Sequence, residues 1–195
     1  MAERLTRAKV VAYAADLADE LGLEQVTFTR LGRSLGIAPP GVYRHVTDVA
    51  DLRGAIGQLA AHEASVVVSK ACAGLSGREA LSGIIAALRG WANDHPGRYA
   101  ALQVAPDLDD AEGQAAAGEI LAVIASALRA YALSGDDLTD AVRLIRSTTH
   151  GFISLELSGG FKQPRPLATT LDRVIDALDT VLRSWGEAGS TGHAS

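Results

Sequence analysis

Residues 26–46, VTFTRLGRSLGIAPPGVYRHV, give the clearest indication of the fold of this 195-residue chain. Its first half carries apolar side chains at the three- and four-residue spacing of one helix face: Phe28, Leu31 and Leu35. Thr27 suits the position before that helix, because its hydroxyl can accept a hydrogen bond from an otherwise unpaired N–H. Gly36 suits the end, because glycine accepts the positive φ that a helix C-terminus commonly needs. The pattern predicts a short helix that is bounded at both ends.

A second short helix is predicted to follow at once. Pro39 and Pro40 favour its first turn, where the N–H that proline lacks would be unpaired anyway. Val42 and Val46, four residues apart, give it one buried side. The other side carries Pro40, Gly41, Tyr43, Arg44 and His45. Two short helices joined by a tight turn, the second presenting Arg, Tyr and His, form a helix-turn-helix suited to a DNA major groove.

The net charge of −5 argues against a nucleic-acid partner until its distribution is considered. Residues 1–56 carry seven basic and seven acidic residues, so the whole acidic excess lies in the remainder. Three of those basic residues, Arg30, Arg33 and Arg44, lie in the helix-turn-helix stretch. Attraction to phosphate depends on the charges that face the duplex rather than on the total. The charge pattern is therefore compatible with DNA binding by the first quarter of the chain.

The rest of the composition predicts a soluble, cytoplasmic protein. Cys72 is the only cysteine, which excludes an intrachain disulfide and suits a reducing compartment. The N-terminus lacks the apolar segment of a secretory signal. The longest largely apolar run, 120–128, has nine residues, far fewer than a bilayer span needs.

Helical periodicity runs through the whole chain, so the predicted fold class is all-α. Besides the helix-turn-helix, helices are predicted at about 6–21, 48–72, 78–93, 107–133, 137–158 and 167–185, with a short one through Tyr99 and Leu102. We predict a three-helix DNA-binding head at 1–47 and a helical effector-binding and dimerisation domain at 48–186. Residues 187–195 are small and polar, and we predict a disordered tail there.

The stretch 27–46, followed by Asp48 and Leu52 at the start of the next helix, resembles the tetracycline-repressor (TetR-like) family of bacterial transcription factors. A second stretch, 150–161, HGFISLELSGGF, is similar to the His-Gly motif of the WHG-type C-terminal subgroup, whose upstream tryptophan is absent here. Ala38 and Val49 depart from the family pattern, which usually has a hydroxyl residue and a lysine there. The resemblance implies a ligand-responsive regulator, a repressor by default, that binds a palindromic operator and is released by a small-molecule effector.

Arg44 is the one strong candidate for reading bases, because its planar guanidinium can donate two hydrogen bonds to a guanine. Pro40 offers contact with a thymine methyl group. Tyr43 and His45 are expected to donate to phosphates, as are residues at the start of the preceding helix, and such contacts position the protein without carrying sequence information. The predicted DNA-binding residues are Thr27, Thr29, Arg30, Pro39, Pro40, Gly41, Tyr43, Arg44 and His45.

So few base-reading residues cannot select one genomic site, which favours a two-fold homodimer that presents two helix-turn-helices to two half-sites. The last two long helices are the predicted interface, because their apolar stripes are wider than a surface helix needs. The alternative is that these stripes fill the core of a single chain. The predicted interface residues are Leu144, Phe152, Leu155, Leu171, Val174, Ile175, Leu178, Leu182 and Trp185.

The C-terminal helices are expected to enclose a small effector, and no cofactor or metal is predicted. The candidates are polar or aromatic residues on otherwise apolar helices: Trp91, Tyr99, Gln103, Tyr131, Arg146, Thr149, His150 and Phe152. His150 is the best single candidate, because it belongs to the second motif and is followed by a glycine that leaves space. For each residue alone, an ordinary place in the core or the interface is an equal alternative. The effector must bind DNA-competent and incompetent dimers with different affinity.

Two other classes of protein remain as alternatives. A small helical enzyme would need a catalytic set, and the chain has no HExxH, phosphate-binding loop or cysteine cluster. His62 and Glu63 are adjacent and point apart on a helix, so they do not form a metal pair. A homodimeric helical interaction protein that does not bind DNA is the second alternative, favoured by Ala38 and Val49.

Overall fold

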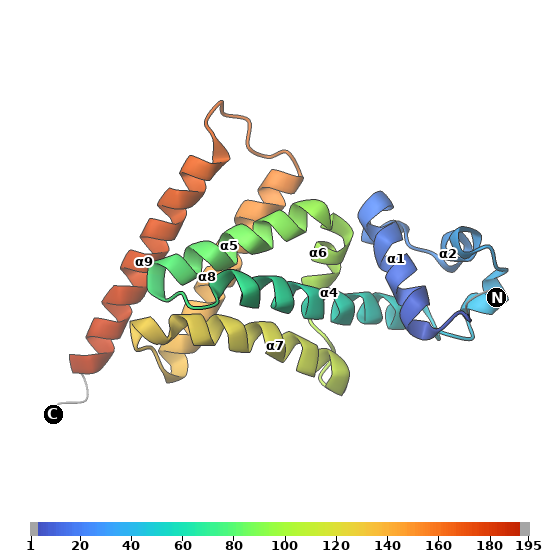
Figure 1. The fold of residues 1–195 in the computed structure, drawn as a ribbon, viewed down its shortest axis with the longest axis horizontal. Coiled ribbons are helices and arrows are strands. Elements are labelled where there is room, and N and C mark those ends of the chain that lie inside the picture. The colour runs from blue at the N-terminus through green and yellow to red at the C-terminus, as the bar shows by residue number, and fades with distance from the viewer. Residues whose placement is uncertain (1–3, 192–195) are drawn as a thin grey trace. The chain divides into compact units, whose positions relative to one another are not determined.

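The computed structural model describes residues 4–191, and the side chains among them as far as Glu187 (Figure 1). Within that range the chain is helical and contains no strand, which confirms the predicted all-α class. The α-helices are α1 (Arg7–Leu21), α2 (Phe28–Leu35), α3 (Pro39–Val42), α4 (Val49–Cys72), α5 (Gly77–Asp94), α6 (Pro96–Leu102), α7 (Ala111–Ala127), α8 (Gly135–Leu157) and α9 (Leu167–Thr191). Two 3₁₀ helices accompany them, η1 (Leu23–Gln25) and η2 (Leu128–Tyr131).

Contacts divide the chain into two units. Among the described residues, unit 1 comprises 4–64 and 91–119, and unit 2 comprises 65–90 and 120–191. Helices α4, α5 and α7 each contribute to both units. The helix-turn-helix therefore shares its unit with the first part of α4 and with α6, beyond the boundary at residue 47 that the sequence suggested.

Unit 1 has an apolar core formed by α1, α2, α3, the start of α4 and Ala101 of α6. In α1, Thr6 caps the N-terminus by accepting a hydrogen bond from the Lys9 N–H. Helix α6 lies directly against α1 (Figure 1). At this crossing a Cβ on Gly97 would overlap the backbone of Ala18, so the two helices approach as closely as their backbones allow.

Unit 2 has a separate core formed by α5, η2, α8 and α9. Helix α9 ends later than the sequence suggests, because it continues to Thr191 rather than stopping near Trp185. Gly186 lies within this helix, where its missing Cβ leaves room for the Tyr131 carbonyl. The first part of the predicted disordered tail, 187–191, is thus helical, and 192–195 fall outside the described residues.

The helix predicted at 107–133 is shorter at both ends. Asp110 accepts a hydrogen bond from the Gly113 N–H at 2.9 Å and so caps α7, whereas Asp107 and Asp109 precede the helix and Glu112 lies in its first turn. At the other end α7 gives way to η2 and to Ala132, which has a positive φ of 55°. Similarly, α3 is regular only through Val42, and residues 43–45 follow as a turn.

Among the described residues, no single helix is long and apolar enough to cross a bilayer. The segments Ala111–Tyr131 and Gly135–Leu157 meet the length and composition criteria only as a pair, and that pair is bent by 114°.

Candidate nucleic-acid interface

The first helix of the helix-turn-helix is fixed at both ends by its own sequence. The Thr27 hydroxyl accepts a hydrogen bond from the Arg30 N–H at 3.3 Å, and Gly36 adopts the left-handed conformation with φ 68°, both as predicted. The chain then folds back so that the Ile37 N–H donates to the Gly32 carbonyl at 2.9 Å. A Cβ on Gly32 would lie 2.9 Å from the Ile37 carbonyl oxygen, so the turn needs glycine at this position.

The second helix, α3, is a single turn. Ala38 precedes it in an extended conformation and gives no side-chain cap. The Gly41 N–H donates to the Ala38 carbonyl at 2.8 Å, and the His45 N–H donates to the Val42 carbonyl at 2.9 Å. Val42 and Val46 are both buried, as their spacing predicts. Tyr43 and Arg44 therefore follow α3 on a turn whose inner side is anchored in the core of unit 1.

The nine predicted DNA-binding residues all belong to unit 1, on α2, on α3 and in the segments beside them. Gly41 and His45 are half-buried, and the other seven are exposed. The structure thus collects them on consecutive elements of one helix-turn-helix, with polar groups accessible to a partner.

Three of these side chains have different local surroundings. Tyr43 is 59% exposed, and its ring meets the Phe28 ring edge-on with centroids 4.6 Å apart, so its packing leaves the surface accessible. The Arg30 guanidinium donates to the backbone carbonyl and the side-chain amide oxygen of Gln25, at 3.2 and 2.7 Å. Arg44 is exposed and forms no hydrogen bond or ion pair with the described part of the chain.

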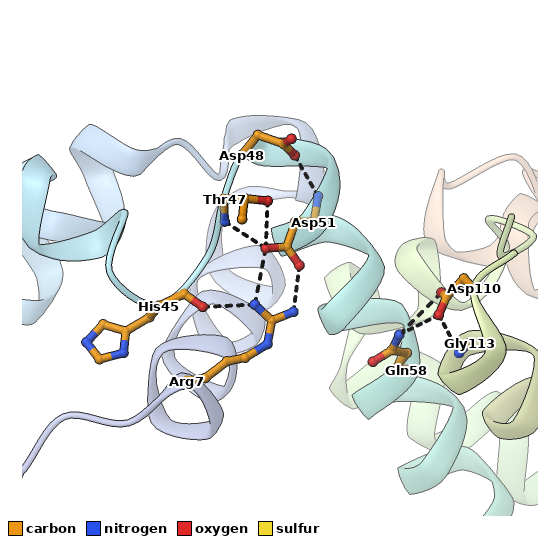
Figure 2. Close-up of polar contacts among 8 residues, drawn as sticks. All are labelled: Arg7, His45, Thr47, Asp48, Asp51, Gln58, Asp110 and Gly113. Carbon is orange, nitrogen blue, oxygen red and sulfur yellow. Dashed lines mark hydrogen bonds and ion pairs between the residues drawn. The ribbon is translucent and has the colours of Figure 1, made fainter.

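Sequence reasoning missed an ionic contact that joins the start of α1 to the segment after α3 and to α4 (Figure 2). Arg7, in the first turn of α1, donates to both carboxylate oxygens of Asp51 at 2.6 and 3.1 Å and to the His45 carbonyl at 2.8 Å. Asp51 also accepts from the backbone N–H of Thr47 at 2.7 Å. The Arg7 hydrogen bond lowers the pKa of Asp51 to about 2. Arg7 and Asp51 are 44 residues apart, so no spacing rule links them.

A second ionic cluster, also missed, joins α6 to α1 and α4. Arg98 is buried, and its guanidinium pairs with Asp16 at 2.6 Å and with Asp19, while its Nε lies 3.3 Å from a Glu63 carboxylate oxygen. The backbone N–H of Arg98 donates to Asp19 at 2.8 Å, and the His95 Nδ1 lies 3.1 Å from the same carboxylate. A buried arginine needs such partners, because an uncompensated buried charge is costly. We call these five residues the Arg98 cluster.

A third polar contact fixes the start of α7 to α4. Asp110, which caps α7, also accepts from the Gln58 side-chain amide, with both oxygens 3.3 Å from Nε2 (Figure 2). One carboxylate therefore serves two helices of unit 1.

The predicted effector residues divide between the two units. Trp91, Tyr99 and Gln103 belong to unit 1, and Tyr131, Arg146, Thr149, His150 and Phe152 belong to unit 2. In unit 1, Trp91 and Tyr99 are buried, and the Gln103 amide donates to the Tyr99 carbonyl at 3.4 Å.

In unit 2 the candidates differ in what they offer a ligand. The Tyr131 hydroxyl donates to Asp179 at 2.6 Å, and burial together with this bond raises the pKa of Tyr131. Arg146 is exposed and His150 is half-buried. Thr149 is 5% exposed, and its buried hydroxyl has no hydrogen-bond partner within residues 4–191.

The second sequence motif has a structural role in unit 2. Glu156 pairs with Arg89 of α5, whose Nε donates to a carboxylate oxygen at 2.6 Å. The ring of Phe152 lies 5.0 Å from that of Phe161, which draws the α8–α9 connection back onto α8. These contacts fasten α8 to its neighbours.

The predicted dimer residues are likewise of two kinds. Leu155 is 49% exposed, and Leu144, Val174 and Trp185 are half-buried. The other five are at most 7% exposed and belong to the core of unit 2, so their side chains are already covered within one chain: Phe152, Leu171, Ile175, Leu178 and Leu182. For these five the structure favours the alternative, a place in the core of a single chain.

Comparisons with known proteins agree with this architecture. The family "Tetracyclin repressor-like, C-terminal domain" matches residues 81–178. The chain is 31% identical over 157 residues to the uncharacterized HTH-type transcriptional regulator Rv0681 of Mycobacterium tuberculosis. The matched region covers 80% of this chain and 72% of that protein.

Solved structures share the fold across nearly the whole chain. The structure of BioQ with its double-stranded DNA operator is 25% identical, with a TM-score of 0.64, and the match covers 91% of this chain and 99% of that one. A TetR variant from Acinetobacter baumannii in complex with minocycline is 16% identical, with a TM-score of 0.63 and coverage of 98% and 100%, and its likeness concerns the fold alone. The chain therefore belongs to the tetracycline-repressor-like family, and it is a DNA-binding transcriptional regulator rather than an enzyme.

Proposed function

We propose that this regulator is a homodimeric repressor that reads a palindromic operator through Arg44 and leaves it when a small effector binds unit 2. The observation that supports base readout is the exposure of the Arg44 side chain and its lack of a partner among the described residues. Its guanidinium is exposed and unpaired among the described residues, directly after the helix that a helix-turn-helix inserts into the groove. The proposed DNA-binding segment is residues 1–47, and the proposed location is the cytoplasm, where a bacterial regulator meets chromosomal DNA.

The neighbours of Arg44 suit phosphate contact. Tyr43 keeps its hydroxyl accessible while its ring rests on Phe28, and Thr27 and Thr29 are exposed at the start of α2. Arg30 is held by Gln25, which orders its guanidinium before any DNA arrives. Such contacts would set the register of the protein on the duplex, and Arg44 would supply the base-specific hydrogen bonds.

The test is operator discrimination measured by fluorescence anisotropy. The wild-type protein first selects a duplex from a random-sequence pool, and this duplex and a scrambled copy then serve as probes. Arg44→Ala should lose most of the discrimination, since one bidentate guanine contact provides about 1–3 kcal/mol against the wrong base. Arg33→Ala is the matched control, because Arg33 is an exposed arginine of α2 outside the proposed site. If Arg44→Ala keeps full discrimination, the proposed base readout is wrong.

Dimerisation is proposed through the exposed faces of α8 and α9. On α8 the partly or fully exposed residues Leu144, Gly151 and Leu155 share one side at helical spacing. On α9, Val174 and Val181 are partly or fully exposed, seven residues apart. Uncharged, accessible faces on two long helices suit helix-against-helix packing with a second copy.

Gly151 allows a sharp test of that interface. A Cβ at Gly151 would meet nothing within 4 Å in one chain, so Gly151→Trp should fold but block a partner at this face. Light scattering coupled to size-exclusion chromatography should report a monomer for Gly151→Trp and a dimer for Gly151→Ala. Gly90→Trp is the control, because a Cβ at this exposed helical glycine also meets nothing within 4 Å. A Gly151→Trp protein that remains dimeric would exclude this face.

For the effector, the buried Thr149 hydroxyl beside His150 carries the proposal. A hydroxyl buried in apolar surroundings without a partner loses its hydrogen bond to water and gains nothing in return. A ligand group that accepts or donates a hydrogen bond would satisfy the Thr149 hydroxyl, and the apolar side chains of unit 2 would surround the rest of the ligand. The expected effector is therefore a largely apolar molecule with a hydroxyl or carbonyl group.

The effector proposal is tested by thermal shift with a panel of apolar alcohols and ketones. A compound that binds the native protein raises its unfolding temperature. Thr149→Val keeps the side-chain shape but removes the hydroxyl, so it should abolish the shift of any compound that also releases the selected duplex. A releasing compound whose shift is the same in Thr149→Val would exclude Thr149 from the site.

A further inference from the structure

Helix α3 is too short to set its own orientation. It has four residues, two of them prolines without an N–H and one a glycine, so few hydrogen bonds of its own stabilise it. Forming an isolated helical turn is unfavourable, because several dihedral angles must be fixed for one hydrogen bond. The direction in which Arg44 leaves the unit must therefore depend on contacts made by neighbouring segments.

Arg7 supplies contacts of this kind on the side of α1 (Figure 2). One guanidinium nitrogen, Nη1, is shared between the His45 carbonyl at 2.8 Å and Asp51 at 3.1 Å, and the other, Nη2, donates to Asp51 at 2.6 Å. His45 is the residue directly after Arg44. Figure 2 shows that the His45 imidazole points away from Arg7, so the contact uses only the backbone.

Asp51 supplies the contacts on the side of α4. Its Oδ2 accepts from the Thr47 N–H at 2.7 Å and from the Thr47 hydroxyl at 3.1 Å, and its own N–H donates to the Asp48 side chain at 2.8 Å. Hydrogen bonds within residues 47–51 thus order this segment, and the bidentate Arg7–Asp51 ion pair links it to α1. Bidentate arginine–carboxylate pairs fix geometry more strictly than single contacts do.

We propose that Arg7 and Asp51 are positioning residues for operator recognition, which fix the segment after α3 to α1 and thereby set the direction of Arg44. This inference rests on the proposed readout by Arg44. Neither residue needs to touch DNA for it. The competing role for Arg7, which is 49% exposed, is a direct phosphate contact.

Asp51→Asn separates the two roles. Removing a negative charge from a DNA-binding unit should tighten binding if general electrostatics dominates, because repulsion of the phosphates falls. If Asp51 positions the readout, Asp51→Asn should instead weaken operator binding, by about tenfold, which corresponds to the loss of one good hydrogen-bonded contact. Binding to the scrambled duplex should change little.

A double-mutant cycle with Arg7→Gln completes the test. Arg7→Gln, Asp51→Asn and the double variant are compared with the wild-type protein on the selected and the scrambled duplex over a range of salt. The double variant should be no worse than either single variant, because the residues act as one pair. The salt slope for Arg7→Gln should stay at the wild-type value, whereas loss of a phosphate contact would reduce it by about one. Circular dichroism confirms that each variant is folded at the assay temperature.

Glu24→Gln is the matched control, since it breaks the Arg53–Glu24 pair of the same unit, at 2.8 Å, without touching the segment after α3. It should keep the wild-type discrimination.

Tighter binding by Asp51→Asn, a reduced salt slope for Arg7→Gln, or additive losses in the double variant would overturn the inference. Arg44→Ala, measured alongside, keeps the two proposals separate. If it loses discrimination while Arg7→Gln does not, only the positioning role fails, and if it loses none, the readout itself fails.

Discussion

The four-residue helix α3 and the 25-residue helix α9 are held in place by different kinds of contact. Helix α9 buries Leu171, Ile175, Leu178 and Leu182 at three- and four-residue spacing, so its own periodic stripe fixes it to the core of unit 2. Helix α3 buries only Val42. Its surroundings include the turn after α2 and the Arg7–Asp51 pair, whose members come from α1 and α4.

The stability of the two helices therefore has different physical origins. A long amphipathic helix is stabilised mainly by apolar packing along its length. A one-turn helix that must stay exposed for recognition has little apolar packing of this kind. Capping groups and ion pairs from neighbouring segments stabilise it instead. Substitutions in each kind of helix can therefore test this contrast.

Leu182→Ala should have the largest effect, because α9 depends on its apolar stripe. Leu182 is fully buried, and truncating a buried leucine typically costs about 2–5 kcal/mol. Urea unfolding followed by circular dichroism measures the change. Arg173→Ala, an exposed position on the same helix, should stay within about 0.5 kcal/mol of wild type. Equal losses for the two variants would contradict an apolar origin for the stability of α9.

Thr27→Ala tests the polar side of the contrast. The Thr27 hydroxyl accepts the Arg30 N–H, and loss of such a cap costs about 1 kcal/mol. The same urea experiment should therefore register a smaller shift of the midpoint than with Leu182→Ala. Thr27→Ser keeps the hydroxyl and should restore most of the stability, and a Ser variant as unstable as the Ala variant would argue against capping.

The Arg7–Asp51 pair predicts a dependence of stability on pH. The pKa of Asp51 is lowered in the folded protein from 3.8 to about 2, so its contribution is complete above pH 3.8 and is lost as the pH falls towards 2. Because Arg7 is half exposed, the contribution should be less than about 1 kcal/mol. The difference in unfolding midpoint between wild type and Asp51→Asn should shrink between pH 4 and pH 2. A difference that is constant over this range would mean that the carboxylate is not stabilised by its partner.

Gly41→Ala should have the smallest effect on stability. Alanine favours a helix over glycine by about 1 kcal/mol, but a Cβ here would lie 3.1 Å from the Ile37 side chain, which offsets part of the gain. If neighbouring segments fix α3, the net change should stay within about 0.5 kcal/mol. A clear rise in thermal unfolding temperature would show instead that intrinsic helix propensity limits α3.

The contrast also explains what the sequence could predict. Apolar periodicity and local caps act over a few residues, so the long helices, the cap at Thr27 and the turn at Gly36 can be predicted from the sequence. Arg98 pairs with Asp16 across 82 residues, and no local pattern encodes such a contact. The stripe on α9 has a further ambiguity, because periodicity indicates that a face is buried without telling whether the same chain or a second copy covers it. Ile175 and Leu182 are covered by their own chain.

The Arg98 cluster has a consequence for building chimeric regulators. A graft that exchanges residues 1–47 alone would separate Arg98 from Asp16 and Asp19 and would leave the arginine buried with only the Glu63 carboxylate nearby. The first helix of the grafted segment would also have to pack as closely against Gly97 of α6 as α1 does. A transplanted DNA-binding segment should therefore include α6, so the exchangeable module of this regulator is discontinuous in sequence.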